Sequence, residues 1–359
     1  MVAGSADADK TVRPTGGVVG YWVARCGLQH PKSSSIGSRD DFIQEQTTAT
    51  CAQKRLLGVL LPPTMRSTIL FASLLAILSA TSACDSADPS SESSDPPVEP
   101  IEKSIKRGLA YDVREVADME AVRSGVSWWY NWSHASSLPS SAAVANQTVY
   151  LPMLWGNDPD TEYAAVKEYI LAHPEVDYLL VLNEPNLTDQ ANMTPQQAAA
   201  EWVKYEQLVA EIESTGRSIN LVGPQMTWGT LTGFTDPVFW LDSFYAWYRA
   251  ANEGREPRID YLGFHWYDFG LEQQLDRLQK FGKQIWVTEM ANWNEAIDTE
   301  AKQIEQMRAM VALCESRDDV FRYAWFTGRW ADADRHTAIF ESDMGQLTAL
   351  GQAYLEAPY

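Results

Sequence analysis

Two glutamates, Glu184 and Glu289, have the surroundings that acid–base chemistry needs. Each ends a short apolar run, within VDYLLVLNEPN for the first and QIWVTEMANWN for the second, which is the pattern of a buried parallel strand. A carboxylate at the end of such a strand lies at the edge of the sheet rather than in its core. Two of them facing each other form the pair of carboxyl groups that hydrolysis of a glycosidic bond requires. The plain alternative is two solvated or ion-paired carboxylates.

The elements that must position these glutamates begin near Ser104. Strand-like runs alternate with helical stretches, and strands are expected at residues 107–113, 126–132, 148–155, 176–184, 219–226, 259–267, 284–290 and 320–326. Helical spacing is clearest at residues 194–214, 299–316 and 346–357, with Thr194 as an N-cap and Pro195 in the first turn. Eight strand–helix units in about 256 residues predict an α/β fold, the (β/α)8 TIM barrel. A doubly wound open sheet is the alternative, but the turn VREVAD after the first strand has no glycine for a nucleotide phosphate.

In a barrel the reactive groups gather at the C-terminal ends of the strands. Glu184 ends the fourth expected strand and Glu289 the seventh, so the two are expected to face each other across the ring. Pro185 is expected to bias Glu184 toward an extended backbone. Carboxyl groups roughly 5–5.5 Å apart would indicate a retaining glycosidase, and about 6.5–9.5 Å an inverting one.

The sequence around these positions resembles a known group of enzymes. Asn183-Glu184-Pro185 on the fourth strand, with a lone Glu289 on the seventh, resembles the glycoside hydrolases of clan A. Further segments together look like glycoside hydrolase family 128, and the resemblance covers residues 106–357: SWWYNW (127–132), VYLPMLWG (149–156), VLNEPN (181–186), GPQMTW (223–228), YLGFHWYD (261–268), WVTEMANWN (286–294) and YAWFTGRW (323–330).

This resemblance implies a retaining hydrolase of β-1,3-glucan. We expect endo action, and exo action is the alternative. It implies that Glu184 is the acid/base, that Glu289 is the nucleophile and that Asn183 hydrogen-bonds the sugar 2-hydroxyl. One alternative keeps the chemistry and changes the glycan to β-1,4-glucan, mannan or xylan. Another is a sugar-binding surface lipoprotein that does not cleave, against which the presence of both glutamates argues.

Several strand-end side chains are candidates for substrate binding, because indole faces stack on pyranose rings and polar groups meet hydroxyls. Tyr267 is expected to orient Glu289, and His265, on the same face of its strand, to contact the sugar or the nucleophile. Trp325 is expected to form the platform under the cleaved sugar. Each of these residues could instead be part of the packing. The complete set is Asn131, Trp132, Asn183, His265, Tyr267, Trp293, Trp325 and Trp330.

The charge and the cysteine content of the chain limit the partners and cofactors that are expected. The net charge of −20 repels nucleic acid and suits a neutral polysaccharide. Cys314 is the one cysteine after Cys84, and neither CxxC nor HExxH occurs, so no zinc site is expected. No metal or organic cofactor is implied, because two carboxylates suffice for hydrolysis. We expect a monomer.

The region before the barrel is expected to direct export. Residues 65–84 combine Arg66, an apolar run and small residues ending at Cys84, which resembles a lipoprotein signal although Thr81 stands where leucine is usual. Residues 85–103 have the composition of an acidic Ser/Pro tether, and residues 104–359 form the catalytic domain. Because a signal must begin the chain to work, residues 1–64 are expected to be a mis-called or disordered extension. The protein is expected to be anchored at the cell surface or in the periplasm by a lipid on Cys84, with ordinary secretion as the alternative.

Overall fold

The computed structural model describes residues 99–156, 158–331 and 333–359. The predicted extension (1–64), export signal (65–84) and most of the tether lie outside the described residues. Residues just before the predicted boundary at Ser104 contact the barrel: Ile101 N donates to Gln147 Oε1 (2.9 Å), and Lys103 Nζ donates to the carbonyl oxygens of Val126 (2.7 Å) and Asn146 (3.0 Å). Within the described part of the chain, no helix combines the length and apolar character needed to cross a membrane.

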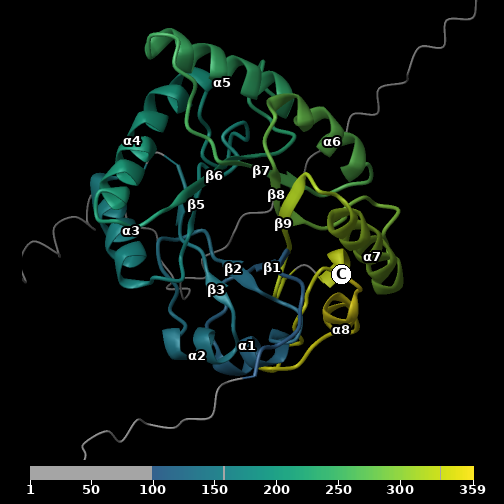
Figure 1. Cartoon of the computed structure of the whole chain (residues 1–359). Helices are drawn as coiled ribbons and strands as arrows, with labels where there is room; N and C mark the ends of the chain where they lie inside the picture. The colour runs from purple at the N-terminus through teal and green to yellow at the C-terminus, as the bar shows by residue number, and fades with distance from the viewer. Residues whose placement is uncertain (1–98, 157, 332) are drawn as a thin grey trace, which may run out of the picture. The chain divides into compact units, whose positions relative to one another are not determined.

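One sheet of parallel strands forms the centre of the molecule (Figure 1). The strand order is β3-β2-β1-β9-β8-β7-β6-β5-β4. The strands are β1 (Arg107–Ala110), β2 (Trp128–Tyr130), β3 (Val149–Tyr150), β4 (Met153–Leu154), β5 (Tyr178–Val181), β6 (Asn220–Met226), β7 (Tyr261–Trp266), β8 (Ile285–Met290) and β9 (Val320–Trp325). Each lies within one of the predicted strand-like runs.

The sheet closes into a ring because its two outermost strands, β3 and β4, are consecutive along the chain. Only Leu151 and Pro152 separate them, and both still bond to neighbouring strands: Leu151 N donates to Trp129 O (2.9 Å) and Leu180 N donates to Pro152 O (3.1 Å). The two short strands are therefore one barrel strand with a proline in it, since proline cannot donate a backbone hydrogen bond. The predicted (β/α)8 TIM barrel is confirmed.

Helices surround the ring (Figure 1). They are α1 (Val116–Val122), α2 (Ser140–Ala145), α3 (Asp160–Ala172), α4 (Pro195–Glu213), α5 (Pro237–Ala251), α6 (Leu271–Leu278), α7 (Glu300–Ser316) and α8 (Ala349–Glu356), with short 3-10 turns η1 (Gln279–Phe281) and η2 (Ala333–Arg335). The three helices with the clearest sequence pattern correspond to α4, α7 and α8. Thr194 is the N-cap of α4, as predicted, and forms a capping box with Gln197.

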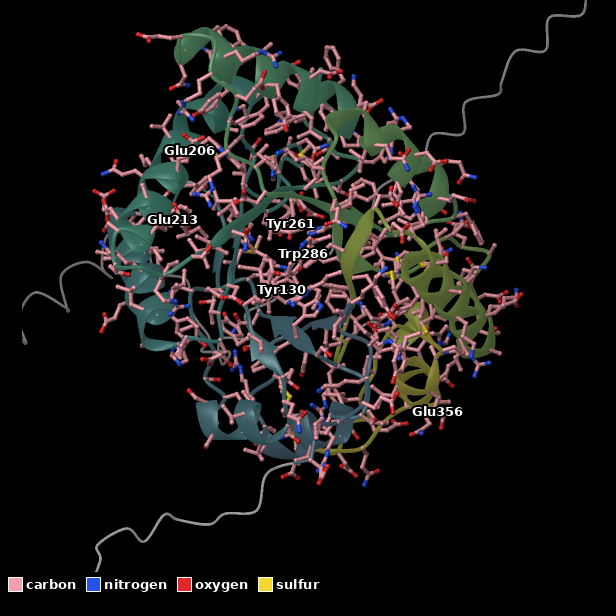
Figure 2. The ribbon with its side chains drawn as sticks, in the orientation of Figure 1. Tyr130, Glu206, Glu213, Tyr261, Trp286 and Glu356 are labelled. Carbon is pink, nitrogen blue, oxygen red and sulfur yellow. The ribbon has the colours of Figure 1, made fainter. Side chains whose placement is uncertain are left out.

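The two faces of the sheet form separate apolar clusters. Inward-facing side chains such as Trp128, Tyr130 and Trp286 fill the ring, and outward-facing ones pack against the helices. Figure 2 shows Tyr130 and Trp286 at the centre, whereas Glu206 lies on the surrounding helices. Successive residues of a strand point to opposite faces, so position within a strand decides which side chains reach the ring.

The two ends of the barrel sequence are joined through Arg107, whose side chain is fully buried. Its guanidinium donates to Tyr323 Oη (2.9 Å) and to carbonyl oxygens at the C-terminal end of α8, including Tyr354 O (2.8 Å) and Ala357 O (2.7 Å). These carbonyls have no partner within the helix. Arg107 therefore fixes the last helix to the first strand.

We predict that Arg107→Met lowers the free energy of unfolding by about 3–5 kcal/mol, because buried acceptors would lose their charged donor. Urea denaturation would measure this change in the free energy of unfolding. The exposed Arg308 of α7 offers a matched control, and Arg308→Met should stay within about 0.5 kcal/mol of the parent. Equal effects of the two substitutions would contradict the role given to Arg107.

Candidate active site

Glu184 lies three residues after the end of β5, in a backbone conformation that is unusual for its residue type. Its φ is +44° and that of Leu182 is +61°, so the prediction that Pro185 would hold Glu184 extended is wrong. Such left-handed conformations cost about 1–3 kcal/mol each outside glycine and persist where neighbouring structure imposes them. Here Asn183 N donates to Trp155 O (2.7 Å) and Glu184 N donates to Gln225 O (2.9 Å), so both flanking strands hold the turn.

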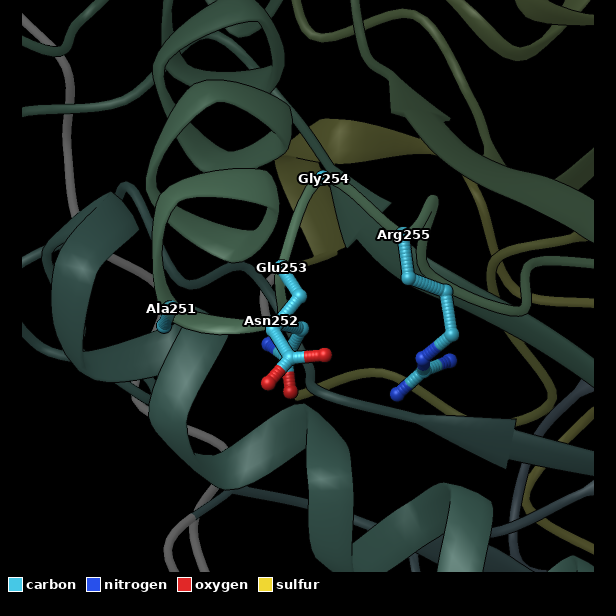
Figure 3. A pocket seen from close by; sticks show the side chains of 5 residues that line it. All are labelled: Ala251, Asn252, Glu253, Gly254 and Arg255. Atoms are coloured by element: carbon cyan, nitrogen blue, oxygen red, sulfur yellow. The ribbon is translucent and has the colours of Figure 1, made fainter.

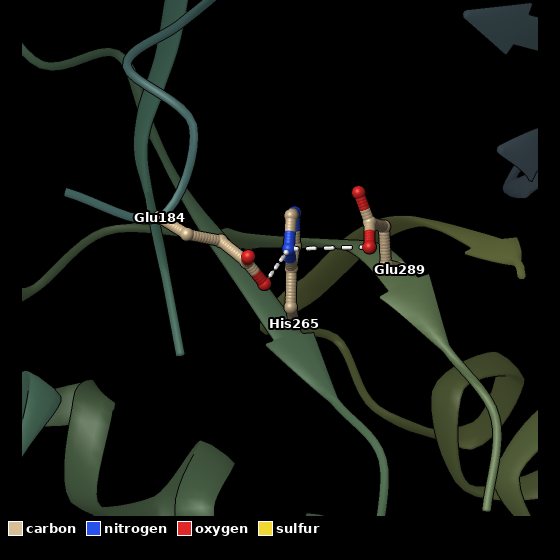
Figure 4. A group of neighbouring side chains, drawn as sticks. All are labelled: Glu184, His265 and Glu289. Atoms are coloured by element: carbon tan, nitrogen blue, oxygen red, sulfur yellow. Dashed lines mark hydrogen bonds and ion pairs between the residues drawn. The ribbon is translucent and has the colours of Figure 1, made fainter. Parts of the chain in front are cut away.

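Glu289 lies within β8, and the side chain of His265 from β7 lies between it and Glu184 (Figure 4). A register shift between Phe264 and His265 pairs His265 with Glu289 across the two strands. His265 Nδ1 is 2.8 Å from Glu184 Oε1 and 3.4 Å from Glu289 Oε2. One carboxylate oxygen of each glutamate and a ring nitrogen of His265 all lie within 4.8 Å of one another. The predicted meeting of the two glutamates is therefore present in the fold.

Three donors orient the carboxyl group of Glu289. Tyr130 Oη donates to Oε1 (2.9 Å), Trp132 Nε1 donates to the same oxygen (2.7 Å), and Tyr267 Oη donates to Oε2. Only 5% of Glu289 is exposed. The predicted contact of Tyr267 with Glu289 is present, and Trp132 makes a contact of the same kind.

The two carboxyl groups have different electrostatic surroundings. Burial raises the pKa of Glu184 above 4.5, the nearby carboxylate of Glu289 raises it further, and the hydrogen bond from His265 opposes both. Burial alone would lower the pKa of His265, but the carboxylates of Glu289 and Glu184 raise it above 6.5. Burial also raises the pKa of Tyr267, which therefore remains a hydrogen-bond donor. A carboxyl group with a raised pKa, beside one held by three donors, is an arrangement suited to acid–base catalysis.

Two buried polar atoms beside the glutamates have no hydrogen-bond partner among the described residues. They are Asn183 Oδ1 and His265 Nε2. An unsatisfied buried acceptor or donor costs about 1–3 kcal/mol, so such atoms mark positions where a bound ligand would supply a partner. Asn183 Nδ2, by contrast, donates to Gln190 Oε1 (3.2 Å).

Asn131 has a role other than the predicted sugar contact. Its Nδ2 donates to Asp112 Oδ1 (2.9 Å) and Ala135 O (3.2 Å), while its Oδ1 accepts from Tyr150 Oη and Ser133 N. Its hydrogen-bonding capacity is used within the protein. We infer that Asn131 supports the loop after β2.

A group of five aromatic side chains, here called the aromatic wall, adjoins Glu289. It consists of Trp132, Tyr267, Trp293, Phe326 and Trp330. Tyr267 stacks on Trp293 with ring centroids 4.0 Å apart, and Phe326 lies 5.2 Å from Trp330, 5.7 Å from Trp293 and 5.9 Å from Trp132. All but Phe326 are partly exposed. Three predicted binding tryptophans, Trp132, Trp293 and Trp330, thus lie in one cluster.

Trp325 is not part of this wall, and the prediction that it forms the platform under the sugar is wrong. It is fully buried on the outer face of β9, where its Nε1 donates to Thr337 O (2.9 Å) and its ring lies 6.2 Å from that of Tyr354 in α8. The strand alternation turns Phe326, its neighbour, into the ring instead. An indole with no exposed face has nowhere to stack a sugar.

Sequence reasoning missed Tyr130 and Phe326. The signal for Tyr130 was present, because Trp128, Tyr130 and Trp132 alternate along one strand and must share a face. The same rule separates Phe326 from Trp325, but only once it is known which face of β9 lies inward.

Glu184, His265 and Glu289 are also residue types that bind metal ions. Here His265 Nδ1 already faces Glu184, and both oxygens of Glu289 accept from neighbouring donors. These bonds favour the prediction that the site works without a metal, which stays a prediction. A separate shallow hollow after α5, lined by Ala251, Asn252, Glu253, Gly254 and Arg255, lacks such a pair of carboxyl groups (Figure 3).

Comparisons with known proteins agree with this site. The family model of the glycosyl hydrolase catalytic core matches residues 108–354, so the chain is a glycoside hydrolase. A subgroup II endo-β-1,3-glucanase of family 128 from Pseudomonas viridiflava is 50% identical, with a TM-score of 0.68, over 72% of this chain and 100% of that chain. A second, from Sorangium cellulosum, is 32% identical with a TM-score of 0.60, over 70% of this chain and 98% of its own. The chain belongs to glycoside hydrolase family 128, as its motifs predicted.

A curated relative, alkali-sensitive linkage protein 1 of Schizosaccharomyces pombe, is 26% identical over 245 residues. The match takes in 65% of this chain and 41% of that protein. The chain therefore spans less than half of this relative's length.

We predict that the pKa of Glu184 falls in Glu289→Gln, because the neighbouring negative charge is removed while the burial of Glu184 is kept. Carbon-13 NMR of the labelled carboxyl group would follow this titration. Asp189→Asn is the matched control: its carboxylate also raises the Glu184 pKa, but as the weakest of the contributions, so the fall should be smaller. An unchanged or higher Glu184 pKa in Glu289→Gln, with His265 titrating as in the parent, would show that the two carboxyl groups are not coupled as described.

Proposed function

We propose that this hydrolase cleaves β-1,3-glucan by a retaining double displacement, with Glu184 as acid/base and Glu289 as nucleophile. The observation that carries the proposal is the approach of the two carboxyl groups to within 4.8 Å around His265, at the C-terminal ends of barrel strands. In retaining enzymes the carboxyl groups are about 5–5.5 Å apart, whereas inverting enzymes need about 6.5–9.5 Å to admit a water.

In the first step, Glu289 attacks the anomeric carbon as Glu184 gives its proton to the glycosidic oxygen. The bond to the leaving sugar breaks and a glycosyl ester forms on Glu289. In the second step, Glu184, now a carboxylate, takes a proton from water, and the resulting hydroxide displaces Glu289 from the sugar. Two inversions leave the anomeric configuration unchanged.

The pKa shifts suit this division of work. A raised pKa keeps the proton on Glu184 at a higher pH than an ordinary glutamic acid would allow, so activity should decline as the pH rises through that pKa. Tyr130, Trp132 and Tyr267 hold the Glu289 carboxylate for attack. The unpartnered Asn183 Oδ1 is an acceptor for a sugar hydroxyl, in agreement with the role that the resemblance implies.

The substrate and the mode of cleavage are inferred from relatives. Both family 128 structures described above are endo-β-1,3-glucanases, and one of them is 50% identical to this chain. The aromatic wall offers stacking surfaces for neutral sugar rings. We therefore propose endo action on β-1,3-glucan, and β-1,4-glucan, mannan or xylan are the alternatives that a substrate panel would separate.

We predict that Glu289→Ala and Glu184→Ala each lower kcat on laminarin by at least about a thousandfold, because each removes a group needed in the transition state. Azide should restore turnover of an activated aryl β-glucan substrate in both, with opposite products. In Glu289→Ala azide replaces the nucleophile in one displacement and gives the α-azide, whereas in Glu184→Ala it attacks the glycosyl-enzyme and gives the β-azide. Proton NMR distinguishes the two anomers.

Glu341→Ala, at an exposed position, is the control and should keep parental activity. Circular dichroism should show all three variants folded. Full turnover by Glu289→Ala without azide, or the same azide anomer from both variants, would overturn the assignment. Binding of laminarin without any turnover by the parent would favour the non-cleaving alternative.

We also propose that the protein is exported and anchored by a lipid on Cys84, an assignment that rests on the sequence pattern of residues 65–84. Cys84→Ser should move the protein from the membrane fraction to the soluble fraction of the producing cells, because the acyl chains supply the membrane affinity. Cys314→Ser, in the buried core, is the control and should leave fractionation unchanged. Unaltered membrane association of Cys84→Ser would contradict the anchor.

A further inference from the structure

The segment that follows β9 carries two members of the aromatic wall, Phe326 and Trp330, and an ion pair fastens it to α1. Arg329 donates through Nη1 to Asp118 Oδ2 (2.5 Å) and through Nη2 to Asp118 Oδ1 (2.9 Å). Only 1% of Asp118 is exposed. A bidentate pair of this kind fixes geometry as well as charge. Arg329 directly precedes Trp330, so the ion pair that holds Arg329 also restrains the backbone of Trp330.

The pair is also tied to the loop that leads to α8. Arg329 Nε donates to Glu341 O (2.7 Å), its Nη2 also donates to Asp343 O (3.0 Å), and Gly345 N donates to Asp118 Oδ1 (2.7 Å). Burial alone would raise the pKa of Asp118, but the bonds from Arg329 and Gly345 hold that pKa below 3.8. The Asp118 carboxyl group is therefore ionised at neutral pH, and its ion pair with Arg329 persists there.

Contacts on the other side of the segment restrict it further. Thr327 Oγ1 donates to Ala110 O (2.6 Å) at the end of β1, and a side chain on Gly328 would overlap the ring of Tyr111. The ion pair of Arg329 with Asp118 on one side and the end of β1 on the other thus hold the backbone between Phe326 and Trp330.

A continuous set of contacts links this segment to the reacting groups. Trp330 lies 5.2 Å from Phe326 and 6.4 Å from Trp293, with rings stacked in the second case. Trp293 stacks on Tyr267, whose hydroxyl donates to Glu289. A shift of Trp330 would therefore alter the outer part of the aromatic wall, while the hydrogen bonds to Glu289 from Tyr130 and Trp132 would remain.

We propose that Asp118 and Arg329 are positioning residues, which hold Trp330 in place for binding a sugar ring at the aromatic wall. This inference rests on the proposed function. Neither residue touches Glu184 or Glu289. Their effect should therefore fall on substrate binding more than on the chemical step.

The test compares Arg329→Met, Arg329→Lys, Asp118→Asn and Trp330→Ala on laminari-oligosaccharides. Arg329→Met, Asp118→Asn and Trp330→Ala should each raise KM by up to about tenfold, which is the size of one aromatic contact, and leave kcat within about twofold. Arg329→Lys keeps the positive charge but cannot form the bidentate pair of the guanidinium, so its KM should lie between those of the parent and Arg329→Met. The double variant Arg329→Met/Trp330→Ala should bind no worse than Trp330→Ala alone, because both act through one side chain.

Arg317, which precedes β9 at the opposite end of the barrel, provides the matched control. It pairs with Asp319 (2.8 Å) and Asp276 (2.8 Å). Arg317→Met should lower the Tm as Arg329→Met does but leave KM at the parental value. Titration calorimetry in the inactive Glu184→Gln background would measure the dissociation constants directly, including those of variants with low stability.

Unchanged KM and binding in Arg329→Met and Asp118→Asn, with only a lower Tm, would show that the pair is merely structural. Additive losses in the double variant would also overturn the proposal. A parent enzyme with no activity on and no affinity for β-1,3-glucan would instead refute the proposed function, and the inference would fall with it. The two failures are therefore distinguishable.

Discussion

The site depends on one imidazole placed between two carboxyl groups. His265 Nδ1 lies 2.8 Å from Glu184 and 3.4 Å from Glu289, and none of the three residues is more than 8% exposed. Two carboxylates this close and this far from water repel each other strongly, so a shared positive or proton-donating group is needed to hold them together. His265 is this group. Closure of the barrel puts it in place, because β5, β7 and β8 bring the three residues to the same end of one ring.

The two carboxyl groups differ because their neighbours differ. Glu289 accepts hydrogen bonds from the hydroxyl groups of Tyr130 and Tyr267 and the indole of Trp132, whereas Glu184 contacts His265 and lies near the carboxylates of Glu289 and Asp189. These different surroundings suit the proposed roles, in which Glu184 releases a proton and Glu289 attacks carbon. The strained backbone at Glu184 belongs to this arrangement, since a turn with φ of +44° is held by hydrogen bonds that it donates to two neighbouring strands.

The aromatic wall connects this chemistry to the outer layer of the fold. Its rings belong to the ends of β2, β7, β8 and β9, so no single loop determines its shape. Trp330 is the member farthest along the chain from its strand, and the ion pair of Arg329 with Asp118 ties its backbone to α1. A helix on the outside of the barrel, α1, thereby helps to hold the aromatic wall in place. We infer that this ion pair serves the geometry of the aromatic wall, because its bidentate form fixes the orientation of both side chains.

The amino-acid sequence determined the order of strands and helices, the N-cap of α4, the family and the positions of the two glutamates at strand ends, because these follow from local periodicity and short motifs. It did not determine which aromatic faces inward. Trp325 and Phe326 are adjacent and both apolar, and only the pairing of β9 with β1 and β8 decides that Trp325 packs against α8 while Phe326 enters the ring. Register is a property of neighbouring strands, and a slip of one residue reverses every side chain, so such choices belong to the tertiary structure alone.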